Sequence, residues 1–186
     1  MIIKIADSEN ELEEVIKLRY EVNTLELQKD FLPKGFEPKD RHAVQLLASQ
    51  NEQLLGCLRY RMPDSSDDLT EEWGIRHNLK IAITDRLAVL PKYRNSRVAY
   101  LLMLAVYKQA LLSDAKLALI ETEEHLLKMY RRLGFMPYRE KQYAFGKRFQ
   151  LFINPWDVKR LTELNSPFAS VYEKYMQELN AFAQVA

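Results

Sequence analysis

The sequence predicts an α/β (α+β) fold in which helices cover a central sheet of mixed strand direction. Strand-like and helix-like segments alternate along most of the chain, with one hairpin near its start and helices at its end. The length of 186 residues, with 47% hydrophobic and 28% charged residues, is typical of one globular domain with a single core. We therefore expect one domain over 1–186, with a C-terminal helical extension over about 155–186.

The first half is predicted to hold a strand, a helix, a loop and a hairpin. Asp7 or Ser8 can cap the helix, because short polar side chains accept hydrogen bonds from first-turn N–H groups. Two apolar runs around a four-residue polar break are typical of a β-hairpin. The predicted ranges are a strand at 2–6, a helix to about Val22, a loop at 33–41, and hairpin strands at 43–49 and 54–62.

An acidic segment follows at 63–72, and it combines proline and serine with five carboxylates. Charge runs of this kind are usually solvated, so we predict an acidic surface loop. A strand at 80–90 comes next and ends at Pro91, which lacks the N–H that a strand interior needs. Residues 91–97 form a predicted basic turn, and 98–112 form an apolar helix without glycine or proline.

The last third is predicted to add a buried strand at 116–121, a helix, a pair of strands and two C-terminal helices. Thr122 can cap the first of these helices, and Gly134 stands where a C-cap is expected. Aromatic alternation around Gly146 indicates one long strand or a strand pair within 135–152. A short helix is expected near 156–164. Ser166 and Pro167 then begin the last helix, whose apolar stripe suits the core or a homodimer.

Composition excludes several classes of protein. Lys and Arg number 27 against 26 Asp and Glu, so no global charge favours nucleic acid. Cys57 is the only cysteine, which rules out an intrachain disulfide and a cysteine zinc site. His42, His77 and His125 lack metal-ligand spacing, so we expect no metal. No apolar run reaches the ~18 residues of a membrane span, and a cytoplasmic setting is the expectation.

The chemically informative unit is the strand, basic turn, helix, strand and helix from Ile81 to Phe135. A helix N-terminus presents free N–H groups and partial positive charge, which together suit an anion. Arg94 and Arg97 add guanidinium forks that match phosphate oxygens. The pattern therefore indicates a phosphate site. A surface turn with incidental arginines is the alternative.

Two stretches of this unit resemble signatures of the GNAT acyltransferase superfamily: Arg86 to Leu102, and Met129-Tyr-Arg-Arg-Leu-Gly-Phe. The resemblance implies a mostly antiparallel sheet with helices on both faces. It also implies a split between the strands at 81–90 and 116–121, where an acyl donor would lie. The residues implied to bind the donor are Leu87, Ala88, Val89, Arg94, Asn95, Ser96, Arg97, Val98 and Ala99.

One departure from that family concerns the pyrophosphate turn, Gln/Arg-x-x-Gly-x-Gly/Ala. Arg94 fills its first place and Ala99 its last, but Arg97 replaces the central glycine. Glycine permits close backbone approach to a pyrophosphate, whereas arginine brings a bulky charge. This departure favours acyl carrier protein over free coenzyme A, because the carrier protein's arm has a single phosphate. The basic side chains expected to attract it are Lys92, Arg94 and Arg97, extended by Lys128, Arg131 and Arg132.

The N-terminal half narrows the resemblance to the long-chain N-acyl amino acid synthases and the acyl-homoserine-lactone synthases. Arg19, Asp40, Arg59 and Arg86 match places that these groups fill alike, and Ser166-Pro-Phe is similar to the tail of the first group. The lactone synthases carry Glu where this chain has Ile83 and Phe where it has Asn23. We therefore favour the amino acid acylating branch, or a plain N-acetyltransferase.

Amine acylation needs a base for the amine and an acid for the leaving thiolate. Tyr130 stands where the superfamily often keeps a general acid, although a core aromatic is the alternative. Asp85 and Glu121 are the candidate bases. Strand alternation places Asp85 on one face with Ile81, Ile83, Leu87 and Val89. A salt bridge to Arg59 is its competing role.

Arg19, Arg59 and Arg86 are the candidates for holding the carboxylate of the acceptor, because arginine binds carboxylates through two parallel hydrogen bonds. Structural ion pairs are the alternative. The predicted function is an N-acyltransferase that moves an acyl group from coenzyme A or acyl carrier protein to a small primary amine. A conventional acetyl-CoA-dependent N-acetyltransferase and a non-catalytic sensor of acyl thioesters or small metabolites are the rivals.

Overall fold

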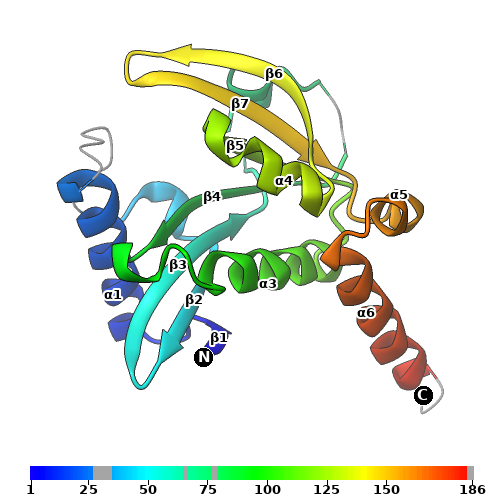
Figure 1. Cartoon of the computed structure of the whole chain (residues 1–186), viewed down its shortest axis with the longest axis horizontal. Helices are drawn as coiled ribbons and strands as arrows, with labels where there is room; N and C mark the ends of the chain where they lie inside the picture. The colour runs from blue at the N-terminus through cyan, green and yellow to red at the C-terminus, as the bar shows by residue number, and fades with distance from the viewer. Residues whose placement is uncertain (27–34, 65–66, 77–78, 184–186) are drawn as a thin grey trace. The chain divides into compact units, whose positions relative to one another are not determined.

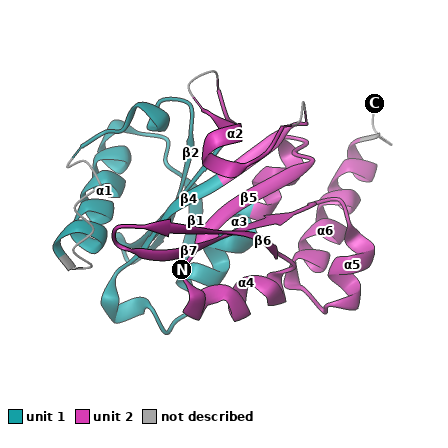
Figure 2. Ribbon diagram, turned by 90° about the horizontal axis from the view of Figure 1, so that it is seen from above, with its two compact units in different colours: residues 1–62, 84–106 teal, residues 63–83, 107–186 magenta. Residues whose placement is uncertain are grey.

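The structure is a computed structural model and describes residues 1–26, 35–64, 67–76 and 79–183 (Figure 1). The chain forms two compact units. Unit 1 comprises Met1–Met62 and Thr84–Val106, and unit 2 comprises Pro63–Ile83 and Tyr107–Ala186 (Figure 2). The expectation of one domain over 1–186 stays a prediction.

Unit 1 contains the first four strands of the sheet, in the order β1-β2-β3-β4. β1 pairs antiparallel with β2, and β2 pairs antiparallel with β3, which confirms the predicted hairpin. Asn51 and Glu52 connect the hairpin with φ of 49° and 64°. Two positive φ values give the tight turn whose twist matches the strands. The bounds are Ile2–Ile5 for β1, Val44–Gln50 for β2, Gln53–Arg61 for β3 and Ile81–Val89 for β4, whose last six residues belong to unit 1.

Helix α1 (Glu9–Tyr20) covers one face of this sheet. Ser8 caps it as predicted, because its hydroxyl accepts a hydrogen bond from the Glu11 N–H at 3.3 Å. Val15 and Leu18 pack into a core cluster with residues of β2, β3 and β4. A π-helix continues the chain from Glu21 to Glu26, and Pro38–Asp40 form a 3-10 turn within the predicted loop, whose residues 33–34 lie outside the described residues.

The opposite face of β3 meets the start of helix α3 (Val98–Leu112). A Cβ on Gly56 would lie 2.8 Å from Val98 Cγ1 and 2.9 Å from the Ala88 carbonyl oxygen. Glycine is therefore required at this point of β3 for β4 and the first turn of α3 to pack closely. Unit 1 thus has helices on both faces of its strands, as the fold class predicted.

Strand β4 departs from the extended conformation at Arg86, whose φ is 57°. Cys57 and Arg59 share a face of β3, because strand side chains alternate. Cys57 packs in one core cluster with Ala88, and Arg59 bonds Asp85. Asp85 and Ala88 therefore lie on the same face although they are three positions apart, which is the geometry of a bulge at Arg86. The prediction that Asp85 shares its face with Leu87 and Val89 is wrong, because the extra residue of a bulge reverses the alternation.

Unit 2 contains the remaining strands, with the first residues of β4 followed by β5, β7 and β6. The first residues of β4 lie beside β5 as a parallel pair, where the Lys116 N–H donates to the Lys80 carbonyl at 2.7 Å. The other neighbours pair antiparallel. The predicted parting of the strands at 81–90 and 116–121 stays a prediction. The bounds are Leu117–Thr122 for β5, Met136–Tyr143 for β6 and Gly146–Ile153 for β7, so 135–152 is a strand pair.

Two helix predictions in unit 2 need correction. The acidic segment contains helix α2 (Leu69–Trp73), because Asp68 caps its N-terminus and Gly74 ends it at φ 68°. Residues 65–66 of that segment lie outside the described residues. Thr122 does not cap a helix, because it is the last residue of β5; a 3-10 turn at Glu124–Leu126 precedes helix α4 (Leu127–Leu133). Gly134 closes α4 at φ 110°, as predicted.

The C-terminal helices are α5 (Val158–Glu163) and α6 (Pro167–Ala183). Ser166 caps α6 as predicted, because its hydroxyl accepts from the Phe168 N–H at 3.2 Å and donates to the Leu133 carbonyl at 2.7 Å. Phe168 stacks on Tyr107 of α3, with ring centroids 4.3 Å apart. The far end of α6 exposes Phe182, and its packing in a homodimer stays a prediction.

Candidate active site

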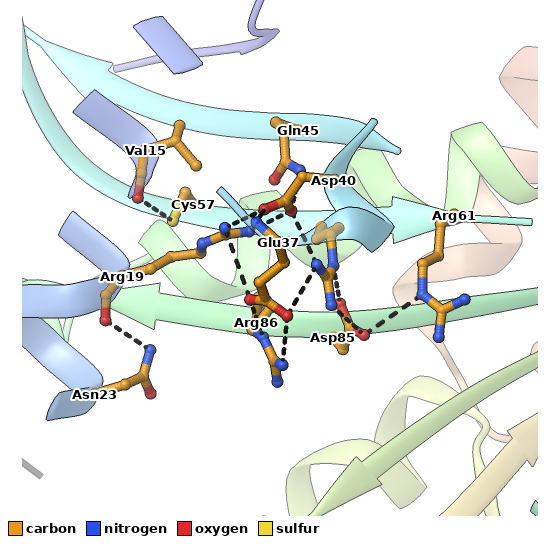
Figure 3. Close-up of polar contacts among 11 residues, drawn as sticks. Val15, Arg19, Asn23, Glu37, Asp40, Gln45, Cys57, Arg61, Asp85 and Arg86 are labelled. Atoms are coloured by element: carbon orange, nitrogen blue, oxygen red, sulfur yellow. Dashed lines mark hydrogen bonds and ion pairs between the residues drawn. The ribbon is translucent and has the colours of Figure 1, made fainter. Parts of the chain in front are cut away.

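Three arginines and three carboxylates of unit 1 form one buried or half-buried cluster, called here the charge cluster (Figure 3). The segments that contribute are α1, the 3-10 turn at 38–40 with the residue before it, β3 and β4. The members are Arg19, Glu37, Asp40, Arg59, Asp85 and Arg86. Folding thus brings together side chains that stand up to 67 positions apart, because Arg19 and Arg86 reach carboxylates of the same turn.

Asp40 is the most heavily bonded carboxylate of the cluster, and its side chain is 1% exposed. Arg19 donates to both of its oxygens, at 2.8 and 2.7 Å, and Arg59 and Gln45 each donate to Oδ1 at 2.9 Å. Burial opposes ionisation of Asp40. The hydrogen bonds from Arg19, the Glu37 N–H and Arg59 outweigh that cost and hold the pKa of Asp40 below its usual range.

Arg59 links the carboxylates of two segments. Its Nε donates to Asp85 Oδ1 at 2.6 Å and its Nη2 to Asp85 Oδ2 at 2.9 Å, while Nη1 bonds Asp40. Burial alone would lower the pKa of Arg59, but the hydrogen bonds and charges of Asp85, Glu37 and Asp40 raise it above its usual value. The guanidinium is therefore permanently charged and fully engaged by protein carboxylates.

Glu37 and Arg86 form the third pair of the cluster. Arg86 Nε and Nη2 donate to the two oxygens of Glu37 at 2.8 and 2.7 Å, and Arg59 Nη1 lies 3.4 Å from Glu37 Oε2. Burial opposes ionisation of Glu37, but bonding to Arg86 and the charges of Arg59 and Arg19 lower its pKa. The sequence alone does not indicate Glu37 or Gln45, because neither belongs to a motif; their nearness to Asp40 was the one available signal.

The structure thus brings Arg19, Arg59, Arg86 and Asp85 into one cluster, as their candidate roles required. Each of the three arginines already donates two parallel hydrogen bonds to a carboxylate of the protein. The competing interpretation of Asp85, a salt bridge to Arg59, is observed. Binding of an acceptor carboxylate by these arginines stays a prediction.

The predicted donor-binding segment of unit 1 runs from the end of β4 through the basic turn into α3. Residues 94–97 are exposed, while Val98 is buried. Arg94 Nε donates to the Val89 carbonyl at 3.2 Å, so this arginine is held beside the strand end. Ser96 accepts from the Val98 N–H at 3.3 Å, which orders the start of the helix. The exposed guanidinium of Arg97 and the helix N-terminus fit a phosphate-bearing arm.

In unit 2, Glu121 receives hydrogen bonds from two neutral donors. The Tyr143 hydroxyl donates at 2.9 Å and Gln150 Nε2 at 3.2 Å, both to Oε2. Gln150 is opposite Glu121 in the β5–β7 register, and its amide also donates to the Glu72 carbonyl at 2.8 Å. Burial, then the bond to Glu121, raises the pKa of Tyr143. Tyr143 and Gln150 were not predicted, because their contact depends on strand register.

Tyr130 lies in α4 of unit 2 and is 6% exposed. Its ring meets Phe135 edge-on, with centroids 5.7 Å apart. Burial raises the pKa of Tyr130 to about 12, so the phenol carries its proton at neutral pH. A proton-carrying phenol suits the predicted acid, although the aromatic contact fits a core residue equally well.

The remaining candidate groups are placed as follows. Cys57 is fully buried, and burial raises the pKa of its thiol to about 12, so a thiolate nucleophile is disfavoured. His42 and His125 are exposed, and His77 lies outside the described residues. Within the described parts of the chain, no group of His, Cys, Asp and Glu could hold a metal ion, and no helix is long and apolar enough to cross a membrane.

Comparison with known proteins gives the family and, with it, the class of enzyme. The chain belongs to the acetyltransferase (GNAT) domain family, whose model matches residues 41–137, slightly more than half of the chain. This confirms the predicted superfamily and the assignment as an acyltransferase enzyme. No curated protein matches the chain.

Solved structures with the same fold include members of the predicted branch. FeeM, an N-acyl amino acid synthase from uncultured soil microbes, is 15% identical, with a TM-score of 0.71 over 86% of this chain and 94% of that chain. BjaI, a CoA-dependent acyl-homoserine lactone synthase solved with SAM and isopentyl-CoA, is 18% identical, with a TM-score of 0.68 over 86% and 84%. An acyl-CoA N-acyltransferase from Pseudomonas aeruginosa is 20% identical, with a TM-score of 0.63 over 81% and 96%. At these sequence identities, the comparisons show that the chain shares the fold of these proteins.

Proposed function

We propose that the protein transfers an acyl group from a thioester to a primary amine, with an amino acid as the expected class of acceptor. The observation that supports this most is the segment in unit 1 where β4 ends in an exposed basic turn and the first turn of α3. Membership of the GNAT family supplies the reaction class. The proposed donors are acyl thioesters of the cytoplasm, so a cytoplasmic location is part of the proposal.

The proposed reaction is direct attack without a covalent enzyme intermediate. The amine nitrogen attacks the thioester carbon and gives up a proton to the base. The negative oxygen that forms accepts a hydrogen bond from a backbone N–H within 87–89. The carbon–sulfur bond then breaks, and the leaving thiolate takes a proton from the Tyr130 hydroxyl. The products are an amide and a free thiol.

Among the two predicted bases, we favour Glu121 over Asp85. Both oxygens of Asp85 accept hydrogen bonds from the Arg59 guanidinium, at 2.6 and 2.9 Å. The hydrogen bonds that the described residues give to Glu121 all fall on Oε2 and come from neutral groups. Its Oε1 is therefore the oxygen that can accept the proton of the amine.

For the donor, we propose acyl carrier protein in preference to free coenzyme A. Lys92, Arg94 and Arg97 are exposed in unit 1, and Lys128, Arg131 and Arg132 are exposed in unit 2. An acidic carrier protein is attracted by exposed positive charge, and salt weakens that attraction. The side chain of Arg97 also occupies the place of the family's pyrophosphate glycine. The alternative, a conventional acetyl-CoA-dependent N-acetyltransferase, uses Arg97 to bind the nucleotide phosphates.

Thiol release measured with acyl-CoA and acylated carrier protein, across a panel of amino acids and other amines, tests the function. Amine-dependent release from at least one donor is expected. Tight donor binding without release for every amine would identify a sensor and overturn the proposal.

The carrier is tested by kcat/KM for one acyl chain on both carriers, at low and high salt. The wild type should prefer the carrier protein, and salt should shrink the preference. Arg97→Gly should weaken it further. Equal or better use of coenzyme A at every salt concentration would contradict the carrier proposal but leave the acyltransferase function intact.

A further inference from the structure

Strand β4 reaches the proposed donor-binding residues through a backbone conformation that an arginine rarely adopts. Arg86 has φ of 57° in the middle of the strand. We propose that Glu37 is a positioning residue, whose grip on Arg86 holds this bulge and thereby places the backbone of 87–89 for the donor. The part of this inference that concerns donor binding rests on the proposed function. The grip, meaning the two hydrogen bonds that Arg86 donates to Glu37, is a property of the folded chain.

The conformation at Arg86 needs a cause. In the left-handed region the Cβ of an ordinary residue crowds the following carbonyl oxygen, which disfavours it by roughly 5- to 30-fold relative to the usual regions. Bulges with one left-handed residue normally place glycine there, since glycine has no Cβ. Such a conformation persists only when its surroundings over-determine it.

Glu37 supplies that constraint from outside the strand. Its two oxygens accept from Arg86 Nε and Nη2 at 2.8 and 2.7 Å, a geometry that fixes both the position and the plane of the guanidinium. Glu37 is itself anchored, because its N–H donates to Asp40 Oδ2 at 2.9 Å and Arg59 lies 3.4 Å from its Oε2.

The residues around Arg86 are held as well. Asp85 is bonded through both oxygens to Arg59, and Ala88 is fixed in the core cluster against Val15 and Leu18 of α1. The bulge is thus fixed on both sides, and Glu37 holds the bulged residue itself. Because one extra residue reverses the alternation, loss of the bulge would turn the backbone of 87–89 to a different direction.

The first test is a pair of substitutions at Arg86, which remove the same side-chain bonds and differ only in backbone preference. Urea unfolding should show Arg86→Gly to be more stable than Arg86→Ala, by roughly fivefold or more in the unfolding equilibrium constant. Thr84, in the same strand without a positive φ, is the matched control. There the order should reverse, because glycine weakens an ordinary strand position. The same order at both positions would show that position 86 does not require the left-handed conformation, and this would overturn the proposal.

The second test asks whether Glu37 acts through Arg86. Glu37→Gln should weaken binding of the S-octyl thioethers of coenzyme A and phosphopantetheine by about tenfold in the wild type, the effect of losing one charge-assisted bond. In the Arg86→Gly background, glycine adopts the left-handed conformation without help from Glu37. Glu37→Gln should therefore weaken thioether binding by less than about threefold there, which is well below the effect of losing one charge-assisted hydrogen bond. Equal losses in both backgrounds would mean that Glu37 is merely structural.

Failure of the proposed function and failure of the positioning role of Glu37 give different results. A wild type that binds neither thioether overturns the proposed function and the part of the inference that concerns the donor, while the urea series still tests the left-handed conformation at position 86. A wild type that binds one of them, with Glu37→Gln binding it equally well, overturns the positioning role and leaves the proposed function standing.

Discussion

Asp85 of unit 1 and Glu121 of unit 2 are both carboxylates on strands, yet the protein surrounds them with opposite partners. Arg59 engages both oxygens of Asp85, while Tyr143 and Gln150 hold one oxygen of Glu121 through neutral groups. The first arrangement neutralises a charge and ties segments together. The second holds one oxygen of a carboxylate through neutral hydrogen-bond donors. The difference is the reason for proposing Glu121, rather than Asp85, as the base.

The comparison is tested most directly by exchanging each carboxylate for an amide. Glu121→Gln should lower kcat by about 10²- to 10⁴-fold, because a general base contributes about that much. Its free energy of unfolding should change by about 1 kcal/mol or less. Asp85→Asn should do the opposite, with a clear loss of stability and a smaller change in kcat at a temperature where it is folded. Steady-state kinetics and urea unfolding measure both, and a reversed pattern would assign the base to Asp85.

The structural side of the comparison is tested at Arg59. Arg59→Met should lower the free energy of unfolding by roughly 3–5 kcal/mol, because it leaves buried carboxylates without their partner. The exposed pair of Lys108 and Glu178, at 2.8 Å, is the control. Lys108→Met should cost about 1 kcal/mol or less, since water screens exposed pairs. Similar losses for both variants in urea unfolding would show that the charge cluster does not stabilise unit 1.

Tyr130→Phe tests whether a second residue of unit 2, Tyr130, is the acid in the proposed proton transfer. If Tyr130 protonates the thiolate, kcat should fall by roughly 10²-fold while donor affinity is nearly unchanged. Tyr138 is a matched control, because burial also raises its pKa to about 12 but its hydroxyl donates to the Trp73 carbonyl at 3.0 Å. Tyr138→Phe should keep kcat. Equal kcat for wild type and Tyr130→Phe would remove Tyr130 from the mechanism.

Elements with local signals could be predicted from the sequence. The hairpin, α3, the cap at Ser166 and the end of α4 at Gly134 depend on neighbouring residues, and the structure confirms them. Local signals also existed for α2, where Asp68 and Gly74 bracket the helix, but the acidic composition suggested a loop.

The site itself depended on contacts that no local pattern records. Glu37 bonds a residue 49 positions away, and Glu121 meets Tyr143 through strand register. The bulge at Arg86 could not be predicted from the sequence for a different reason. Glycine is the usual mark of a left-handed residue, and this chain places arginine there because a distant carboxylate stabilises it.

The smallest expected effect concerns the contribution of the charge cluster to stability in acid. Bonding in the folded chain holds the pKa of Asp40 below its ordinary value of 3.8. Because the folded pKa is depressed, this contribution is fully present above about pH 4 and is lost as the pH falls further. Asp40→Asn removes the titrating group, so the variant should be less stable than the wild type at pH 7 by about 1–3 kcal/mol. The difference should shrink as the pH falls below 4, because protonation weakens only the wild type. Urea unfolding between pH 7 and pH 2.5 measures the gap. A gap that stays constant over that range would mean that Asp40 does not titrate with the cluster.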